Sequence, residues 1–164
     1  MNTEEIKEIF REKNALLSGH FKLSSGKHSD TYLQCARILQ YPDIAEKFCC
    51  RIAESMSGLA LDGVAGPAMG GILPAYELAR SLGLPALFSE RDHSGNMMLR
   101  RGFAVRKGER FLVTEDVVTT GGSAQELIRL LEEQGATVPA VACLVNRSSE
   151  NPFSVPLYSL LDIQ

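Results

Sequence analysis

The sequence lacks the clustered cysteines and histidines of metal-binding and disulfide-rich proteins. Its four cysteines form no CxxC pair, and its three histidines are scattered along the chain, so no zinc-type cluster is visible. The adjacent Cys49 and Cys50 are poorly placed to bridge each other. We therefore expect a reduced, cytoplasmic protein whose cysteines are small buried thiols rather than disulfide partners or metal ligands.

Long apolar runs and an excess of positive charge are also missing. No apolar run approaches the ~20 residues of a membrane span, and the N-terminal MNTEEIKEIFREKN is charged and helical in pattern, unlike a signal peptide. With 17 basic and 20 acidic residues, the net charge of −3 gives no general attraction to nucleic acid or to an anionic membrane. The composition therefore favours neither class of partner.

What remains is an ordinary globular composition, with 45% hydrophobic and 23% charged residues. A chain of 164 residues is long enough to bury a sizeable core, and one domain is the natural expectation. We found no internal repeat, low-complexity segment or linker. The sequence therefore predicts a single domain over residues 1–164.

Helical and strand patterns alternate along most of the chain. Asn2 and Glu5 resemble a helix-capping pair, and apolar residues follow at roughly helical spacing as far as Leu16 and Leu17. Further helices are predicted over 42–58, 73–82 and 123–134, and apolar strands over 61–66, 84–89, 111–118 and 138–145. We also predict a turn between short strands within 18–35, a hairpin or flap within 91–109, and a proline-containing tail at the end. This alternation predicts an α/β fold with a central, mostly parallel sheet flanked by helices on both faces.

In such a sheet, ligands bind beyond the carboxyl ends of the strands. Three unusual segments fall at that edge: GPAMGG, SERD and TEDVVTTGGS. In the third, Glu115 and Asp116 interrupt an apolar strand, where burying them would cost several kcal/mol unless something binds them. These acids require hydroxyl or metal partners.

The small residues that follow, 119–123, lie where a helix begins. Backbone N–H groups and the helix dipole attract anions there, glycine allows close approach, and the hydroxyls add donors. No lysine follows the glycines, so this is not a Walker loop. A phosphate site beside a diol site describes a 5-phosphoribosyl group. The alternative is an ordinary strand-to-helix turn whose acids cap nearby amides.

At this point the sequence resembles a known family. TEDVVTTGGS resembles the phosphoribosyl-pyrophosphate (PRPP) signature of type I phosphoribosyltransferases, and its glutamate-first form is similar to that of orotate phosphoribosyltransferases. GHFKLSSGKHSDTY resembles that family's N-terminal segment, GPAMGGI its pyrophosphate loop, and LVNRS its Asp-Arg element. The resemblance runs in order from about Gly19 to Arg147.

The resemblance implies roles for individual residues. Glu115 and Asp116 would hydrogen-bond the ribose 2′- and 3′-hydroxyls and, with Arg91, form the catalytic set. PRPP would also contact two segments after strands: Val117, Val118, Thr119, Thr120, Gly121, Gly122 and Ser123, and Ala68, Met69, Gly70 and Gly71. The alternative for the second segment is a simple helix-start turn.

The orotate contacts implied by the resemblance lie elsewhere in the chain. Arg147 would form a planar fork with the orotate carboxylate, and Ser25, Gly26 and Tyr32 would line the base pocket, with Thr119 also in contact. The alternatives are a solvated arginine at a strand end and a purely structural hairpin.

The flap departs from the family's usual pattern. The mobile-loop lysines are missing from SERDHSGNMMLRRGF, Ser24 replaces a common lysine, and Asn146 stands where an aspartate is common. The segment resembles a shorter, lysine-poor branch of the family. We expect Arg91, helped by Arg100 or Arg101, to replace the lysines, although a solvated hairpin is the alternative for the latter two.

The family's reaction and assembly are implied in the same way. The fold would comprise an N-terminal hood, about 1–40, and a core, about 41–164, with a β-hairpin flap. The enzyme would transfer the phosphoribosyl group of PRPP to orotate in pyrimidine (UMP) biosynthesis. Mg²⁺ would be carried by PRPP rather than held by a protein-made metal site, and two subunits would share active sites in a homodimer.

Two rival functions remain open. The first is phosphoribosyl transfer to another base, a purine or uracil. Arg147 argues against a purine, which has no carboxylate. The second is a non-catalytic, nucleotide-sensing regulator that binds RNA or protein. An isoelectric point of about 5.6 does not supply the basic face that such a regulator should have.

Overall fold

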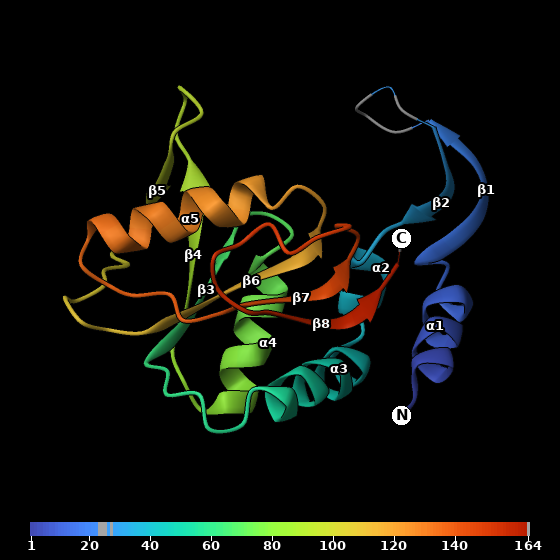
Figure 1. Ribbon diagram of the computed structural model, residues 1–164, viewed down its shortest axis with the longest axis horizontal. Helices are drawn as coiled ribbons and strands as arrows, with labels where there is room; N and C mark the ends of the chain where they lie inside the picture. The colour runs from blue at the N-terminus through green and yellow to red at the C-terminus, as the bar shows by residue number, and fades with distance from the viewer. Residues whose placement is uncertain (23–25, 27, 164) are drawn as a thin grey trace.

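The computed structural model describes residues 1–22, 26 and 28–163, and a six-stranded sheet forms its centre (Figure 1). The strand order is β5-β4-β3-β6-β7-β8. All neighbouring pairs are parallel except β4–β5, which is antiparallel. The predicted α/β fold with a mostly parallel sheet is confirmed. The strands are β3 (Gly63–Pro67), β4 (Ala86–Arg91), β5 (Met97–Leu99), β6 (Phe111–Val118), β7 (Val141–Asn146) and β8 (Leu157–Asp162).

Helices cover both faces of this sheet because alternate strand residues point to opposite sides. Val64 and Leu112 belong to one apolar cluster, together with residues of α3 (Pro42–Ser55) and α4 (Ile72–Leu82). Their chain neighbours Ala65 and Val113 belong to a second cluster, with α5 (Gly122–Glu133). Figure 1 shows α5 on one side of the sheet and α3 and α4 on the other. Burial on both faces explains why these strands are apolar throughout.

The N-terminal region departs from one prediction. Helix α1 (Thr3–Glu12) begins with the predicted capping box between Asn2 and Glu5, but it does not continue to Leu16 and Leu17. Asn14 has a φ of 54°, a left-handed conformation that ends the helical path. The two leucines instead begin strand β1, so their inclusion in the helical pattern was wrong.

The predicted pair of short strands is present in this region. β1 (Leu16–Lys22) pairs antiparallel with β2 (His28–Leu33) and forms a separate two-stranded ribbon. Figure 1 shows this ribbon extending away from the central sheet, above α1. A short helix, α2 (Ala36–Leu39), leads from the ribbon into the core.

The flap and the tail complete the sheet. The predicted hairpin forms between β4 and β5, where the Asp92 carboxylate accepts N–H groups from Ser94 and Asn96 in the turn. The sequence predicted a proline-containing tail and no strand there, yet β8 extends the sheet beside β7. It begins directly after Pro156, whose carbonyl accepts the N–H of Val141. None of the helices formed within residues 1–22, 26 and 28–163 has the length and apolarity needed to cross a membrane.

Candidate functional site

The predicted pyrophosphate loop and the predicted ribose acids meet at the carboxyl edge of the sheet. β3 and β6 are parallel neighbours, so Ala68–Gly71 and the acids of β6 emerge at the same edge. A Cβ atom at Gly70 would lie 2.6 Å from Oδ1 of Asp116, so these two segments are in close contact and only glycine fits there without a shift. The Ala68 N–H donates to the carbonyl of Ser89 and ties the loop to β4 as well.

Glu115 and Asp116 are partly buried at the end of β6. Burial, reinforced by the nearby Asp116, raises the pKa of Glu115 to about 8. Burial also raises the pKa of Asp116, although its Oδ1 accepts the Val117 N–H at 2.8 Å, which opposes the shift. Two acids whose ionised forms are destabilised in the free protein gain most from a ligand that offers hydroxyl donors or positive charge.

The predicted phosphate segment lines a cavity of about 260 Å³ beside Glu115. Gly121, the N-cap of α5, has a φ of 74°, and a Cβ atom there would lie 2.9 Å from Phe153 and Pro152. The N-cap residue Gly121 makes no side-chain capping hydrogen bond, and the first residues of α5, Gly122 and Ser123, line the cavity. We call this cavity the cradle. Its lining residues are Glu115, Val117, Val118, Thr119, Thr120, Gly121, Gly122, Ser123 and Glu126.

Arg91, at the end of β4, is engaged by an acid of the cradle. Its guanidinium donates from Nη1 to Oε2 of Glu126 at 2.8 Å and from Nη2 to Oε1 at 3.0 Å. Nη1 also donates to the carbonyl of Gly95 in the flap turn, at 2.9 Å. The Arg91 guanidinium holds the pKa of Glu126 below its ordinary value. Sequence reasoning did not single out Glu126, since only the fold brings α5 beside the end of β4.

The two adjacent flap arginines lie after β5 rather than on a strand. Arg101 donates to both oxygens of the Glu90 carboxylate, at 2.7 and 2.8 Å, and stacks over Phe88 at 5.7 Å from the ring centroid. Arg100 is exposed. The structure thus gives different surroundings to the two residues.

Arg147 connects the core to the N-terminal ribbon. Its backbone N–H donates to the carbonyl of Val118 at 2.8 Å, so the residue lies beside the cradle segment. Its Nη2 lies 3.4 Å from Oγ of Ser29 on β2. Ser29 is a further candidate that sequence reasoning missed, and the alternation of β2 could have indicated it.

Two of the ribbon residues that were predicted to line the base pocket, Gly26 and Tyr32, lie among the described residues. Tyr32 lies three residues after Ser29 in β2, so its side chain projects from the opposite face of the strand. Its hydroxyl donates to Oε1 of Gln34 at 2.7 Å, and its ring packs against Phe21. Gly26 is exposed with a φ of 81°. Ser25 lies outside the described residues.

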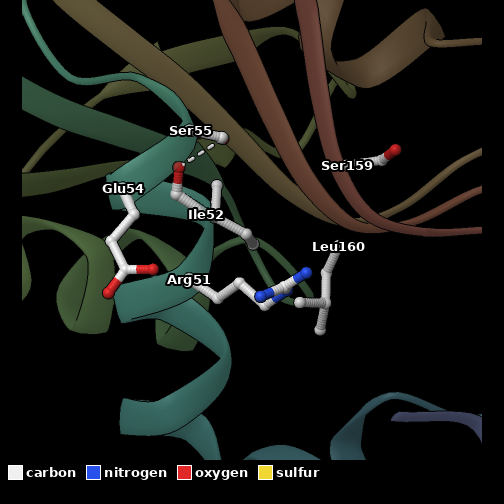
Figure 2. A pocket seen from close by; sticks show the side chains of 6 residues that line it. All are labelled: Arg51, Ile52, Glu54, Ser55, Ser159 and Leu160. Atoms are coloured by element: carbon white, nitrogen blue, oxygen red, sulfur yellow. Dashed lines mark hydrogen bonds between the residues drawn. The ribbon is translucent and has the colours of Figure 1, made fainter. Parts of the chain in front are cut away.

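A larger cavity, of about 400 Å³, lies away from these residues, between the end of α3 and β8. Figure 2 shows its lining, in which the Ser55 hydroxyl donates to the carbonyl of Ile52 at 2.6 Å. The last turn of a helix is the negative end of its dipole, which disfavours an anionic ligand. We therefore place the candidate site at the cradle.

The cysteines are free thiols, and two of the histidines lie close together. All four cysteines are free, with Cys35, Cys49 and Cys143 buried as predicted, and Cys50 partly exposed. The histidines are not all scattered in space, because Nε2 of His20 lies 2.8 Å from Nδ1 of His28 on the ribbon. Within the part of the chain that the structure describes, no group of three or more metal-binding side chains is found.

Comparison with known proteins agrees with this geometry. Residues 45–156 match the phosphoribosyl transferase domain family. An orotate phosphoribosyltransferase of Caldanaerobacter subterraneus subsp. tengcongensis is 52% identical over 165 residues, which cover 100% of this chain and 86% of that protein. The crystal structure of orotate phosphoribosyltransferase from Aeropyrum pernix has a TM-score of 0.80 at 27% identity, covering 96% of this chain and 93% of that one.

The fold extends to enzymes for other bases. The adenine phosphoribosyltransferase of Thermoanaerobacter pseudethanolicus has a TM-score of 0.79 at 18% identity and covers 99% of this chain and 100% of that one, which shows a shared fold only. The type I phosphoribosyltransferase fold predicted from the motifs is thus confirmed. By the family match and by an identity of 52% across its whole length, the chain belongs to the phosphoribosyltransferase family, among the orotate phosphoribosyltransferases.

Proposed function

We propose that this chain transfers the 5-phosphoribosyl group of PRPP to N1 of orotate, giving orotidine 5′-monophosphate and pyrophosphate in pyrimidine biosynthesis. The bond from C1′ to the pyrophosphate oxygen breaks, the bond from C1′ to N1 forms, and N1 loses its proton. One observation carries the proposal: the cradle, the acid pair, the Gly70 loop and Arg147 meet at one sheet edge in a member of this family.

The PRPP molecule would lie along the edge from β6 to β3. The cradle would hold its 5′-phosphate through N–H groups and the hydroxyls of Thr119, Thr120 and Ser123. Glu115 and Asp116 would accept hydrogen bonds from the ribose hydroxyls, which would relieve the cost of burying them. Ala68, Met69 and Gly70 are exposed, and with the buried Gly71 they would face the pyrophosphate, Gly70 next to Asp116.

Orotate would bind on the side of Arg147. Its guanidinium would form a two-point contact with the orotate carboxylate, and Thr119 would line the same side. The 3.4 Å approach of Arg147 to Ser29 supports a base pocket closed by the N-terminal ribbon. We retain Ser25, Gly26 and Tyr32 as proposed contacts, and add Ser29.

Catalysis by these residues would consist of positioning and charge stabilisation. As pyrophosphate leaves, the ribose gains positive charge, which the carboxylates of Glu115 and Asp116 would stabilise. Arg91, with Arg100 or Arg101, would supply positive charge near the pyrophosphate. In the free protein Arg91 is paired with Glu126 and Arg101 with Glu90.

Mg²⁺ is proposed to enter with PRPP. The structure offers two neighbouring hard-oxygen carboxylates at the site, Glu115 and Asp116, which fits an ion that keeps phosphates and waters as its other ligands. When bound, it would neutralise charge on the leaving group. Glu115 and Asp116 would orient the ribose hydroxyls and would accept hydrogen bonds from the waters bound to the ion.

The same proposal includes a cytoplasmic homodimer. Three apolar side chains in α4 and the loop before it are well exposed: Met69 at 83%, Leu73 at 51% and Tyr76 at 65%. They adjoin a small apolar cavity lined by Tyr76, Phe88 and Phe103. Covering this patch with a second subunit would bury it beside the pyrophosphate loop. Sedimentation of the wild type and of Tyr76→Ser would test this, since a monomeric wild type would exclude it.

Steady-state kinetics of Arg147→Ala test the proposed function. The contact it removes is to a carboxylate found only on the base, so KM for orotate should rise at least tenfold while KM for PRPP changes little. Arg147→Lys should recover only part of the loss, because lysine keeps the charge but not the fork. Equal changes in both KM values, or no change in either, would contradict the proposal.

A further inference from the structure

The cradle is lined by an acid, Glu126, that a phosphate site does not obviously need. We call the part of the cradle at Glu126 its rim. Of the nine residues that line the cavity, all of them described, two are acids and none is basic. Glu115 has its place beside the ribose. Glu126 lies one helical turn beyond Ser123 on α5, where its carboxylate would repel an incoming phosphate.

Arg91 offsets this repulsion from outside the cavity. It pairs with Glu126 through two hydrogen bonds, and both side chains are only partly exposed, at 43% and 37%. Its third bond, to the Gly95 carbonyl, fixes the guanidinium against the flap turn. The rim pair is therefore close to neutral as a unit. Without Arg91 the rim would be negative, and without the charge of Glu126 it would be positive.

We propose that Glu126, with Arg91 as its counter-ion, sets the affinity of the cradle for the 5′-phosphate. Glu126 is a positioning and affinity-determining residue: it holds Arg91 at the rim and lowers the affinity that Arg91 alone would give. PRPP and orotidine 5′-monophosphate both carry a 5′-phosphate, so a cradle that bound it more tightly would also retain the product. This inference rests on the proposed function of the cradle.

Ribose 5-phosphate tests the inference, because it carries the phosphate without a pyrophosphate or a base. We would measure its Kd by calorimetry for the wild type, Glu126→Gln, Arg91→Met and the double variant. Glu126→Gln should bind about threefold to tenfold more tightly, as expected for one screened unit charge near the phosphate. Arg91→Met should bind more weakly by a similar factor. The double variant should return to near the wild-type Kd.

Controls separate charge effects from structural ones. Glu133→Gln makes the same charge change on the same helix, about 10 Å further along, and should leave Kd nearly unchanged. In turnover, Glu126→Gln should lower KM for PRPP without raising kcat. Glu126→Ala should give the same direction if charge, rather than shape, is responsible.

Two results would overturn the inference. One is a Glu126→Gln variant that binds ribose 5-phosphate no more tightly than the wild type. The other is a double variant that binds ribose 5-phosphate as weakly as Arg91→Met does, because the effect of Arg91 on binding would then be independent of Glu126. If the wild type consumes orotate but all four proteins bind ribose 5-phosphate equally, the inference fails and the proposed function stands. If the four Kd values follow the expected order but orotate is not consumed, the inference stands and the proposed function fails.

Discussion

Replacing Glu115 by glutamine should stabilise the free protein, and should do so more strongly at pH 8 than at pH 5. Burial and the neighbouring Asp116 raise the pKa of Glu115 from an ordinary 4.5 to about 8. Between these values the folded protein keeps a proton that the unfolded chain releases. The free energy of unfolding therefore falls as pH rises through this window. Glutamine is uncharged and nearly isosteric, so its presence removes the Glu115 contribution to that fall.

The size of the effect follows from the same pKa values. One pKa unit corresponds to about 1.36 kcal/mol, and about three units separate pH 5 from pH 8, so the difference in stabilisation should approach ~3–4 kcal/mol. For a chain of this size, that corresponds to roughly 10 °C in Tm. Asp116 also has a raised pKa and adds to the slope of the wild type. Comparison with Glu115→Gln isolates the contribution of Glu115.

Urea unfolding at pH 5 and pH 8, at constant ionic strength, measures this difference. Glu54→Gln, which makes the same change at an exposed acid on α3, is the matched control. The account would be refuted by a Glu115→Gln variant with equal stabilisation at both pH values, or by one less stable than the wild type at pH 8. Either result would mean that the fold does not disfavour ionisation of Glu115 before substrate binds.

Two other substitutions probe the same edge of the sheet. Asp116→Asn should fold normally and lose about 10- to 150-fold in kcat/KM, the equivalent of one charged hydrogen bond of ~1.5–3 kcal/mol, and unchanged kinetics in a folded variant would remove Asp116 from the site. Gly70→Ala places a Cβ atom 2.6 Å from Oδ1 of Asp116 and should lower kcat/KM for PRPP at least tenfold. The change in Tm should be small because Gly70 is exposed. Wild-type kinetics would show that the loop and the acid need not be in contact.

The sequence predicted well those features that depend on neighbouring residues. Acids within an apolar strand followed by threonine, glycine and serine mark a strand-to-helix junction, and the structure places the cradle there. The Asn2–Glu5 capping box is equally local. The failures lie where local pattern is ambiguous. Leu16 and Leu17 continue a helical spacing, but a left-handed Asn14 turns the chain into a strand.

Features that depend on distant pairing were not visible in the sequence. β8 follows a proline-containing segment and forms only because β7 offers it an open edge. Glu126 meets Arg91 across 35 residues, and Ser29 meets Arg147 across 118. Each of these contacts is set by the packing of a helix or ribbon onto the sheet, which no local pattern records.

The most direct test of the central claim is a spectrophotometric assay of the purified protein with PRPP and Mg²⁺, in which orotate, adenine, hypoxanthine and uracil are offered separately. The structure and the family predict loss of orotate with equimolar release of pyrophosphate, and no comparable turnover of the other three bases. Turnover of a purine or of uracil in preference to orotate, or no turnover of any base by a folded protein, would contradict the account.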